Sequence, residues 1–554
     1  MAPNHSRPLF IRALQRIALA ILATALFLGI SEFVLAASGF RHKPREKVLF
    51  KPTIAGFIRT MEYLIPTHFS PPGYLWISQP DTLQTDRYGF RKPEIPFEKP
   101  PGKYRIAFLG GSTTQGANRP YPERTVRLLN ASVGAHFFEM LNIACSAYST
   151  HQSLMALERW GLPRKPDLVI IYHGWNDASV ASDGYPDHRK DKWMPTDGHI
   201  ATNVPLRRWI ASLRLYQALS LALEKLDADW PQLRVPPDQF ESNLEKMVRM
   251  ARDAGARVMV FTRPASHRRP LPDVTPIAAL AYKKAGFPDD PEERYKAIHQ
   301  TYTAIQRRVV ERNPGAELFD ASAVLDRIQA RHAAGEFGPD IEIFYRDAIH
   351  ITEFAEQLLA EELACAIAPE LAGRIRFIVN SDRYHFLMAE QFLDDMQVFE
   401  AAWHARTCIQ LAGGSHPEAE KILRQAEEQF EFVRLFREGR WGGADGDFDT
   451  KLRKLQKCLS MRPSDLGVCL QIFRLHIYMN RLADAAQAMS GFQPANDRDE
   501  YQWRVFTLQS HKAAGRWSEA VQTARRILEL RPDDAEARDI VDKYSSRIPE
   551  PSKS

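Results

Sequence analysis

From residue 104 onward, short apolar runs alternate with longer stretches in which apolar residues recur every three or four positions. The short runs are rich in β-branched residues and apolar at nearly every position, which is typical of strands buried on both faces of a parallel sheet. The longer stretches have helical periodicity. This alternation predicts an α/β fold, a three-layer α/β/α sandwich with a five-stranded parallel sheet. The predicted strands are residues 104–110, 138–144, 166–174, 256–262 and 316–322.

One long interval interrupts the alternation. Residues 178–238 contain a polar, turn-rich stretch followed by a helix-like stretch. An insertion after the carboxyl end of a strand lies where open α/β sheets bind ligands. Two interpretations remain open: a lid or wall of a binding site, or a peripheral loop and helix that pack on the sheet.

After residue 375 the strand patterns stop, and the chain is helical in pattern to its end. Three segments share a register in which Phe448, Leu482 and Trp517 are equivalent, offset by 34 and then 35 residues, and each segment ends near a proline. A period near 34 with these features predicts tetratricopeptide (TPR)-like repeats over residues 376–548. Such repeats present a concave face, so we expect a protein partner there.

The N-terminal pattern predicts export. Arginines precede the apolar residues 17–37, which are long enough to span a bilayer. A retained transmembrane anchor is our prediction, and a cleaved signal peptide is the alternative. Basic residues on both sides leave the orientation open. Both interpretations place the remaining chain outside the cytoplasm, in the periplasm if the source is Gram-negative.

These patterns divide the chain into four parts. They are an anchor or signal segment over 1–40, a proline-rich lead-in over 41–100, the α/β domain over 101–375 and the helical repeats over 376–548. The lead-in has irregular patterning and no predicted core of its own.

Composition narrows the classes of function. Of the 554 residues, 44% are hydrophobic and 25% are charged, which is typical of a globular chain, and the net charge is only +5. No basic cluster is interleaved with aromatic residues, which argues against nucleic acid as a partner. The five cysteines are scattered without a CxxC pair, and no His/Asp/Glu grouping has metal-site spacing. We predict neither a metal nor a cofactor.

Ser112 is the first candidate for chemistry. The stretch "RIAFLGGSTTQG" ends an apolar run on two glycines and then places a serine at the tip. In a parallel sheet this serine lies at the ligand-binding edge and opens the next helix, which suits a nucleophile. A phosphate-binding loop is disfavoured because GxxxxGK[ST] and GxGxxG are absent. A structural turn is the remaining alternative.

A nucleophilic serine needs a base and a group that orients the base. Asp347 and His350 are three residues apart in "DAIH", after the last predicted strand and before the last helix of the α/β unit, whose predicted start is near Thr352. Acyl transfer also needs donors for the oxyanion. Asn176 in "GWND" follows the third predicted strand and supplies an amide, with an Asn-Asp turn as the alternative.

Four segments in this order, "GGST", "NIACSAYST", "GWND" and "DAIH", resemble the SGNH (GDSL-type) hydrolases, in the bacterial branch that carries GGSTT. The resemblance covers residues 85–370. It implies that Ser112 is the nucleophile, His350 the general base and acid, and Asp347 the residue that orients His350. It also implies an oxyanion hole of the Ser112 N–H, the Ala147 N–H and the Asn176 side chain.

Two positions depart from the family pattern: Gly111 stands where many members have Asp, and Ala147 stands where Gly is usual. The backbone N–H at 147 is retained, but its methyl group restricts φ.

The function implied is an esterase of SGNH type acting on acyl or acetyl esters, with O-acetylated carbohydrate as a candidate substrate. Trp175, Tyr185 and Trp193 would suit the wall of a sugar site. Two alternatives remain: an O-acyltransferase that uses the same triad, and a non-catalytic TPR scaffold for envelope or polysaccharide assembly.

Overall fold

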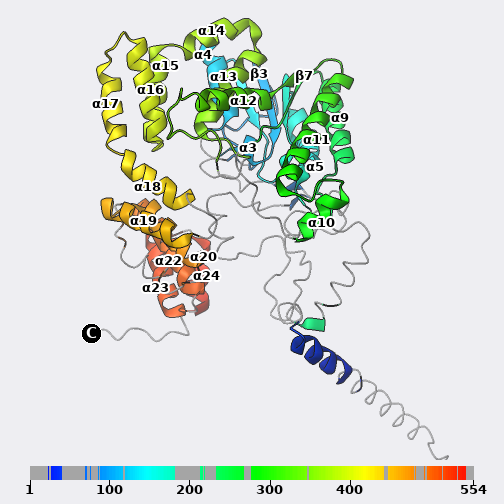
Figure 1. Cartoon of the computed structure of the whole chain (residues 1–554), viewed down its shortest axis with the longest axis vertical. Coiled ribbons are helices and arrows are strands. Elements are labelled where there is room, and N and C mark those ends of the chain that lie inside the picture. Colours follow the sequence, from blue (N-terminus) through cyan, green and yellow to red (C-terminus); the bar gives the residue numbers. More distant parts are fainter. Residues whose placement is uncertain are drawn as a thin grey trace, which may run out of the picture.

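The computed structural model describes residues 85–180, 232–266, 276–345, 349–441, 447–479, 496–513, 516–532 and 534–544, apart from 87, 117 and 118, with shorter stretches elsewhere such as 26–39. A five-stranded parallel sheet lies at the centre of the α/β part (Figure 1). Its strands are β3 (Tyr104–Gly110), β4 (Phe138–Asn142), β5 (Leu168–Tyr172), β6 (Arg257–Phe261) and β7 (Ala316–Phe319). The predicted parallel sheet and its five strands are confirmed.

The strand order creates a switch point. The order is β4-β3-β5-β6-β7, and all neighbouring strands are parallel. The chain passes from β3 to β4 at one edge and then crosses back to β5 on the other side of β3. The connections after β3 and β5 therefore leave in opposite directions, and open α/β sheets bind ligands at the carboxyl ends of strands at such a point.

Helices cover both faces of the sheet (Figure 1). One apolar cluster joins alternate strand residues such as Leu109 and Val260 to α9 (Pro237–Asp253) and α11 (Pro291–Arg312). A second cluster joins Phe108 and Ile170 to α4 (Tyr121–Val133) and α13 (Glu353–Ile367). Successive strand residues point to opposite faces, so an almost continuously apolar strand can serve both clusters. The helices are α4 (Tyr121–Val133), α12 (Ala321–Ala333) and α13 (Glu353–Ile367) on one face, and α5 (Thr150–Ala156), α9 (Pro237–Asp253) and α11 (Pro291–Arg312) on the other.

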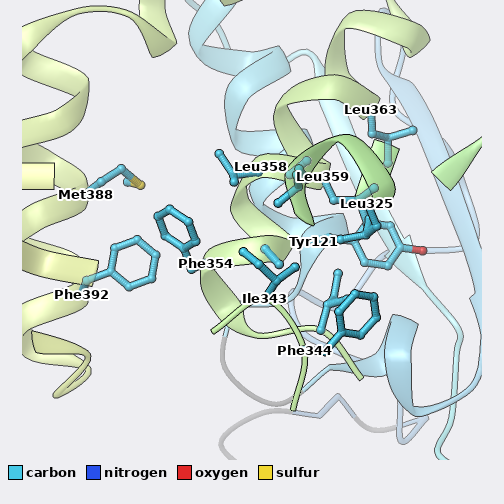
Figure 2. Close-up of a cluster of buried hydrophobic side chains, with 14 of the residues drawn as sticks. Tyr121, Leu325, Ile343, Phe344, Phe354, Leu358, Leu359, Leu363, Met388 and Phe392 are labelled. Atoms are coloured by element: carbon cyan, nitrogen blue, oxygen red, sulfur yellow. The ribbon is translucent and has the colours of Figure 1, made fainter. Parts of the chain in front are cut away.

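The region after the sandwich is helical, as predicted, and it packs on the sandwich through a shared core. Figure 2 shows Phe354 of α13 facing Met388 and Phe392 of α15. The helices are α14 (Ala372–Val379), α15 (Asp382–Asp394), α16 (Val398–Leu411), α17 (Pro417–Glu427), α18 (Phe430–Trp441), α19 (Phe448–Met461), α20 (Leu466–Tyr478), α22 (Asp497–Ala513), α23 (Trp517–Leu530) and α24 (Ala535–Tyr544).

Two features lie before the sandwich. Strands β1 (Phe69–Ser70) and β2 (Leu75–Trp76) form a short antiparallel pair inside the predicted irregular lead-in. Residues 26–37 are helical and expose apolar side chains such as Phe27 and Phe33. Among the described residues, no helix is both long enough and apolar enough to cross a membrane. The predicted span covers residues 17–37, and most of its first part, residues 17–25, lies outside the described residues. The anchor therefore stays a prediction.

Candidate active site

Ser112 is the first residue of α3 (Ser112–Gln115), and only Gly111 separates it from the end of β3. The backbone reverses at Gly111, whose carbonyl oxygen accepts hydrogen bonds from the N–H groups of Thr114 and Gln115 at 3.1 and 2.9 Å. The Ser112 side chain is partly exposed, and its Oγ lies 2.7 Å from Nε2 of His350, 238 positions later in the chain. The structure therefore brings two of the predicted site residues into hydrogen-bond contact at the carboxyl edge of the sheet.

The segment that carries His350 is anchored at both ends. Phe344 and Ile351 form an isolated antiparallel bridge, and the N–H of Tyr345 donates to the carbonyl oxygen of His350 at 2.9 Å. Thr352 then caps α13, which begins at Glu353 and so agrees with the predicted start near Thr352; its hydroxyl oxygen accepts a hydrogen bond from the Ala355 N–H. Asp347 lies outside the described residues, so its predicted role stays a prediction.

Asn176 lies in α6 (Trp175–Ala178), directly after β5. Its Nδ2 donates one hydrogen bond to the carbonyl oxygen of Tyr148 at 2.9 Å, and no described residue accepts a hydrogen bond from the second N–H of the amide. Nδ2 also lies where a side chain at position 111 would be: a Cβ built on Gly111 would be 2.5 Å away. The departure from the family pattern at Gly111 thus makes room for the Asn176 amide beside Ser112.

Ala147 is the third residue of a turn closed by a hydrogen bond from the Tyr148 N–H to the Cys145 carbonyl oxygen at 3.0 Å. Its φ is +66°, a conformation that favours glycine and occurs at this position of type II turns. Of the described residues, none accepts a hydrogen bond from the N–H of Ala147. This N–H is therefore available as a donor, but its direction depends on a backbone conformation that alanine disfavours.

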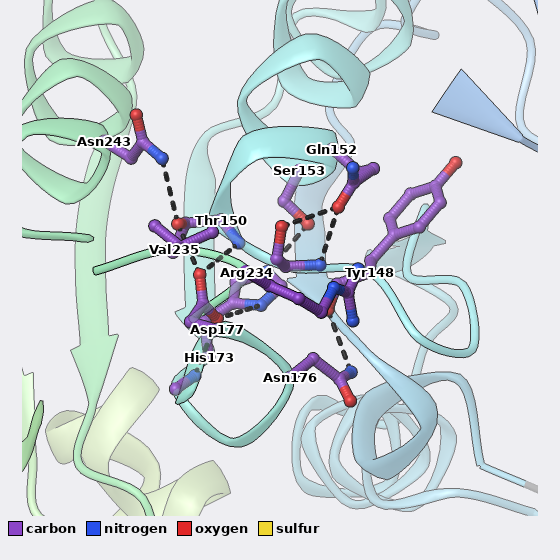
Figure 3. A network of polar contacts seen from close by, with 12 residues as sticks. Tyr148, Thr150, Gln152, Ser153, His173, Asn176, Asp177, Arg234, Val235 and Asn243 are labelled. Carbon is purple, nitrogen blue, oxygen red and sulfur yellow. Dashed lines mark hydrogen bonds and ion pairs between the residues drawn. The ribbon is translucent and has the colours of Figure 1, made fainter. Parts of the chain in front are cut away.

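A buried polar network joins these segments, and Asp177 is at its centre (Figure 3). One carboxylate oxygen of Asp177 accepts from the N–H and the hydroxyl of Thr150 at 2.8 and 2.6 Å, and the other accepts from the N–H of Gly174 at 3.2 Å. Asn243 of α9 donates to Thr150 at 3.1 Å. Asp177 is fully buried. Its hydrogen bonds hold the segment from Gly174 to Asp177, which carries Asn176 and is called the Asn176 turn below, against the first residue of α5.

Sequence reasoning missed Arg263, although its place at the end of β6 puts it at the same sheet edge. Arg263 is fully buried, and its guanidinium lies 3.9 Å from the centroid of the Trp175 ring and 4.9 Å from that of Tyr302. Within the described part of the chain, its Nε and Nη1 find no hydrogen-bond acceptor. Burial lowers its pKa to about 10. Within the described residues, this buried cation is therefore stabilised by cation–π contacts with aromatic rings, one of them the Trp175 ring next to Asn176, and not by an ion pair.

The Trp175 ring is thus used in packing within the chain. It also stacks on Tyr295 with centroids 5.1 Å apart, and its Nε1 donates to the Pro264 carbonyl oxygen at 3.2 Å. Tyr185 and Trp193 lie outside the described residues, so a sugar-binding wall stays a hypothesis.

A second serine–histidine pair lies nearby. Nε2 of His173 is 2.7 Å from Oγ of Ser153, the same distance as in the first pair. Both residues are buried, and burial lowers the pKa of His173 to about 4. His173 is therefore a packed, hydrogen-bonded histidine. Among the described residues there is no group of three or more His, Cys, Asp or Glu side chains that could hold a metal ion.

The α/β part of the chain is similar to known hydrolases. Residues 108–358 match the GDSL-like lipase/acylhydrolase family. Similar solved structures include a lipase/acylhydrolase from Enterococcus faecalis (17% identity, 49% of this chain and 96% of that chain, TM-score 0.29). They also include the acetylxylan esterase Axe2 from Geobacillus stearothermophilus (16% identity, 49% and 95%, TM-score 0.29).

The comparison with curated proteins returns no match. Residues 108–358 are thus similar to GDSL-like lipases/acylhydrolases, and the protein is a hydrolase of the esterase type.

Proposed function

We propose that Ser112, His350 and Asp347 are the catalytic triad of this esterase. The observation that carries the proposal is the 2.7 Å distance between Ser112 Oγ and His350 Nε2. In this mechanism Nε2 accepts the hydroxyl proton as Oγ attacks the ester carbonyl carbon, and the protonated ring then donates that proton to the leaving alkoxide. Water hydrolyses the resulting acyl-enzyme by the reverse proton transfers, and Asp347 orients the ring.

The oxyanion that forms during the attack needs donors close to Ser112. We assign this role to the N–H of Ser112, the N–H of Ala147 and the second N–H of the Asn176 amide. The first two have no acceptor among the described residues, and the Asn176 amide lies against Gly111. Donors already freed from other hydrogen bonds cost little reorganisation when the charge develops.

The Ser153–His173 pair is the internal alternative for an activated serine. Its hydroxyl is fully buried, whereas Ser112 is partly exposed, so a substrate reaches only Ser112 without local unfolding. The low pKa of His173 also makes it a poor proton acceptor near neutral pH.

The remaining proposals concern where and on what the enzyme acts. The family resemblance implies acyl or acetyl esters as substrates, with O-acetylated carbohydrate as a candidate. The N-terminal apolar segment implies that the enzyme acts outside the cytoplasm. The exposed apolar side chains of residues 26–34 support a membrane anchor. Successive helices α22 and α23, which pack on each other through a common apolar cluster, support TPR-like repeats that bind a protein partner.

A fluorophosphonate probe tests the proposal, because it labels only an activated serine that it can reach. We expect the full chain to be labelled, Ser112→Ala not to be labelled, and His350→Ala to be labelled far more slowly. Ser153→Ala is the matched control, since it removes a hydroxyl with an equal distance to a histidine, and it should be labelled like the wild type. Labelling that persists in Ser112→Ala would place the nucleophile elsewhere.

A further inference from the structure

The chain that follows the long interval between β5 and α9 returns directly beside the Asn176 turn. Val180 and Leu233 form an antiparallel bridge, and the N–H of Arg234 donates to the Ser179 carbonyl oxygen at 2.8 Å. The next residue, Val235, donates its N–H to the carbonyl oxygen of Asp177 at 3.0 Å. The two ends of the 178–238 interval are therefore attached to the segment that carries Asn176.

From this segment the side chain of Arg234 extends to the turn that contains Ala147. Its Nη2 donates a hydrogen bond to the carbonyl oxygen of Ala147 at 2.8 Å, and only 2% of the residue is exposed. A hydrogen bond from a charged donor in a buried site is stronger than one between neutral groups. One buried guanidinium thus connects the chain beside Asn176 to the turn of Ala147.

This contact falls on the peptide group that determines where the Ala147 N–H points. The peptide group between residues 147 and 148 is held at both ends, because Arg234 binds its carbonyl oxygen and the Cys145 carbonyl oxygen accepts from its N–H. With that peptide group fixed, the positive φ of Ala147 sets the direction of the Ala147 N–H. Alanine would otherwise relax from this φ, since its Cβ is crowded there, and the N–H would turn away.

We propose that Arg234 is a positioning residue of the oxyanion hole: it holds Ala147 in the conformation that directs the Ala147 N–H at the substrate oxygen. The inference rests on the proposed function, which uses this N–H as a donor. The oxyanion exists only along the reaction path, so loss of Arg234 lowers kcat and leaves KM nearly unchanged. A glycine at position 147 has no such need for Arg234, because glycine adopts a positive φ without crowding.

The test is a double-mutant cycle between Arg234→Met and Ala147→Gly in the full chain, with p-nitrophenyl acetate as the substrate. We expect Arg234→Met to lose roughly 10- to 100-fold in kcat, within the range for an oxyanion donor that is misplaced rather than removed. In the Ala147→Gly background the same substitution should cost less than about 3-fold. A role confined to stabilising the fold gives the same loss in both backgrounds.

Arg164→Met is the matched control. Arg164 is equally buried and also donates to carbonyl oxygens, at 3.0 Å to Ile95 and 2.9 Å to Trp160, but no site residue is among its partners. It should lower the melting temperature without lowering kcat in the folded protein. If Arg234→Met does not fold, Arg234→Lys replaces it in the same cycle. Lysine keeps the positive charge but lacks the planar guanidinium group. We therefore expect Arg234→Lys to lower kcat less than Arg234→Met does, and to lower it less still in the Ala147→Gly background.

Two results would overturn the inference while the proposed function stands: an active wild type whose kcat is unchanged by Arg234→Met, or equal losses in both backgrounds. A wild type that neither hydrolyses the ester nor reacts with the fluorophosphonate overturns the proposed function, and the inference with it.

Discussion

The space beside Gly111 allows a direct test of how the Asn176 amide is positioned. In Gly111→Ala, the new Cβ would lie 2.5 Å from Nδ2 of Asn176 and 3.3 Å from the carbonyl oxygen of Tyr148. The φ of Gly111 is −96°, outside the left-handed region, so the substitution tests space rather than backbone strain. The amide is the end of a flexible side chain, and we expect it to move while the fold stays intact.

The size of the movement sets the size of the effect. Ordinary contact with a Cβ begins at 3.4 Å, so the amide must move by about 1 Å. A misplacement of about 1 Å costs roughly 100-fold in rate, and removal of one oxyanion donor costs roughly 100- to 1,000-fold. We therefore expect Gly111→Ala to lower kcat by about 100-fold, equivalent to about 2.7 kcal/mol of transition-state stabilisation, with little change in KM.

Steady-state hydrolysis of p-nitrophenyl acetate by Gly111→Ala, Asn176→Ala and the double variant measures this effect. The alanine at 111 acts through Asn176, so the double variant should be no slower than Asn176→Ala alone. Gly373→Ala is the control, because a Cβ at that helical glycine meets nothing within 4 Å, and it should keep the wild-type kcat. A wild-type kcat in Gly111→Ala, or losses that multiply fully in the double variant, would refute the reasoning.

Three further predictions concern the supports of the site and of the helical region. Gly174→Ala should lower the free energy of unfolding by about 1–3 kcal/mol, measured by urea denaturation, because φ is +134° and the Cβ would lie 2.7 Å from Cδ of Arg263. An unchanged midpoint would contradict it. Asp177→Asn should cost about 3 kcal/mol by the same assay, since an amide cannot accept from all three donors of the buried carboxylate, and a loss below about 1 kcal/mol would argue against this. His385 and His404 are in contact through their Nδ1 atoms at 2.8 Å, and burial lowers the pKa of His385 to about 4 and that of His404 well below its usual value. Their unfolded forms bind protons first, so their contribution to stability is fully present above about pH 6.5 and is lost as the pH falls toward 4, by up to about 1.4 kcal/mol per pH unit for each ring. Urea denaturation from pH 7.5 to 4.5 should show a steeper decline in the wild type than in His404→Phe, and equal slopes would contradict the prediction.

The local parts of this protein could be predicted from the amino-acid sequence alone. The apolar runs such as residues 104–110 became strands, because a strand buried on both faces needs apolar side chains at successive positions. The position of Ser112 at the carboxyl end of this strand also follows from local sequence, because two glycines end the apolar run and the serine comes directly after them. The helix after His350 was predicted to start near Thr352, which caps it. Each of these depends on residues close together in the sequence.

Tertiary structure decided which of these local pieces meet. The strand order, which places β3 between β4 and β5, brings Ser112 to the turn that carries Asn176, and the packing of α13 brings His350 to Ser112. The contact of Arg234 with Ala147 has no sequence signal, because the two residues are 87 positions apart and neither belongs to a periodic pattern. Hydrophobic periodicity records only whether a side chain is buried, whereas the identity of its neighbour depends on strand register and helix packing across the whole domain. The supports of the oxyanion hole therefore became visible only in the folded chain.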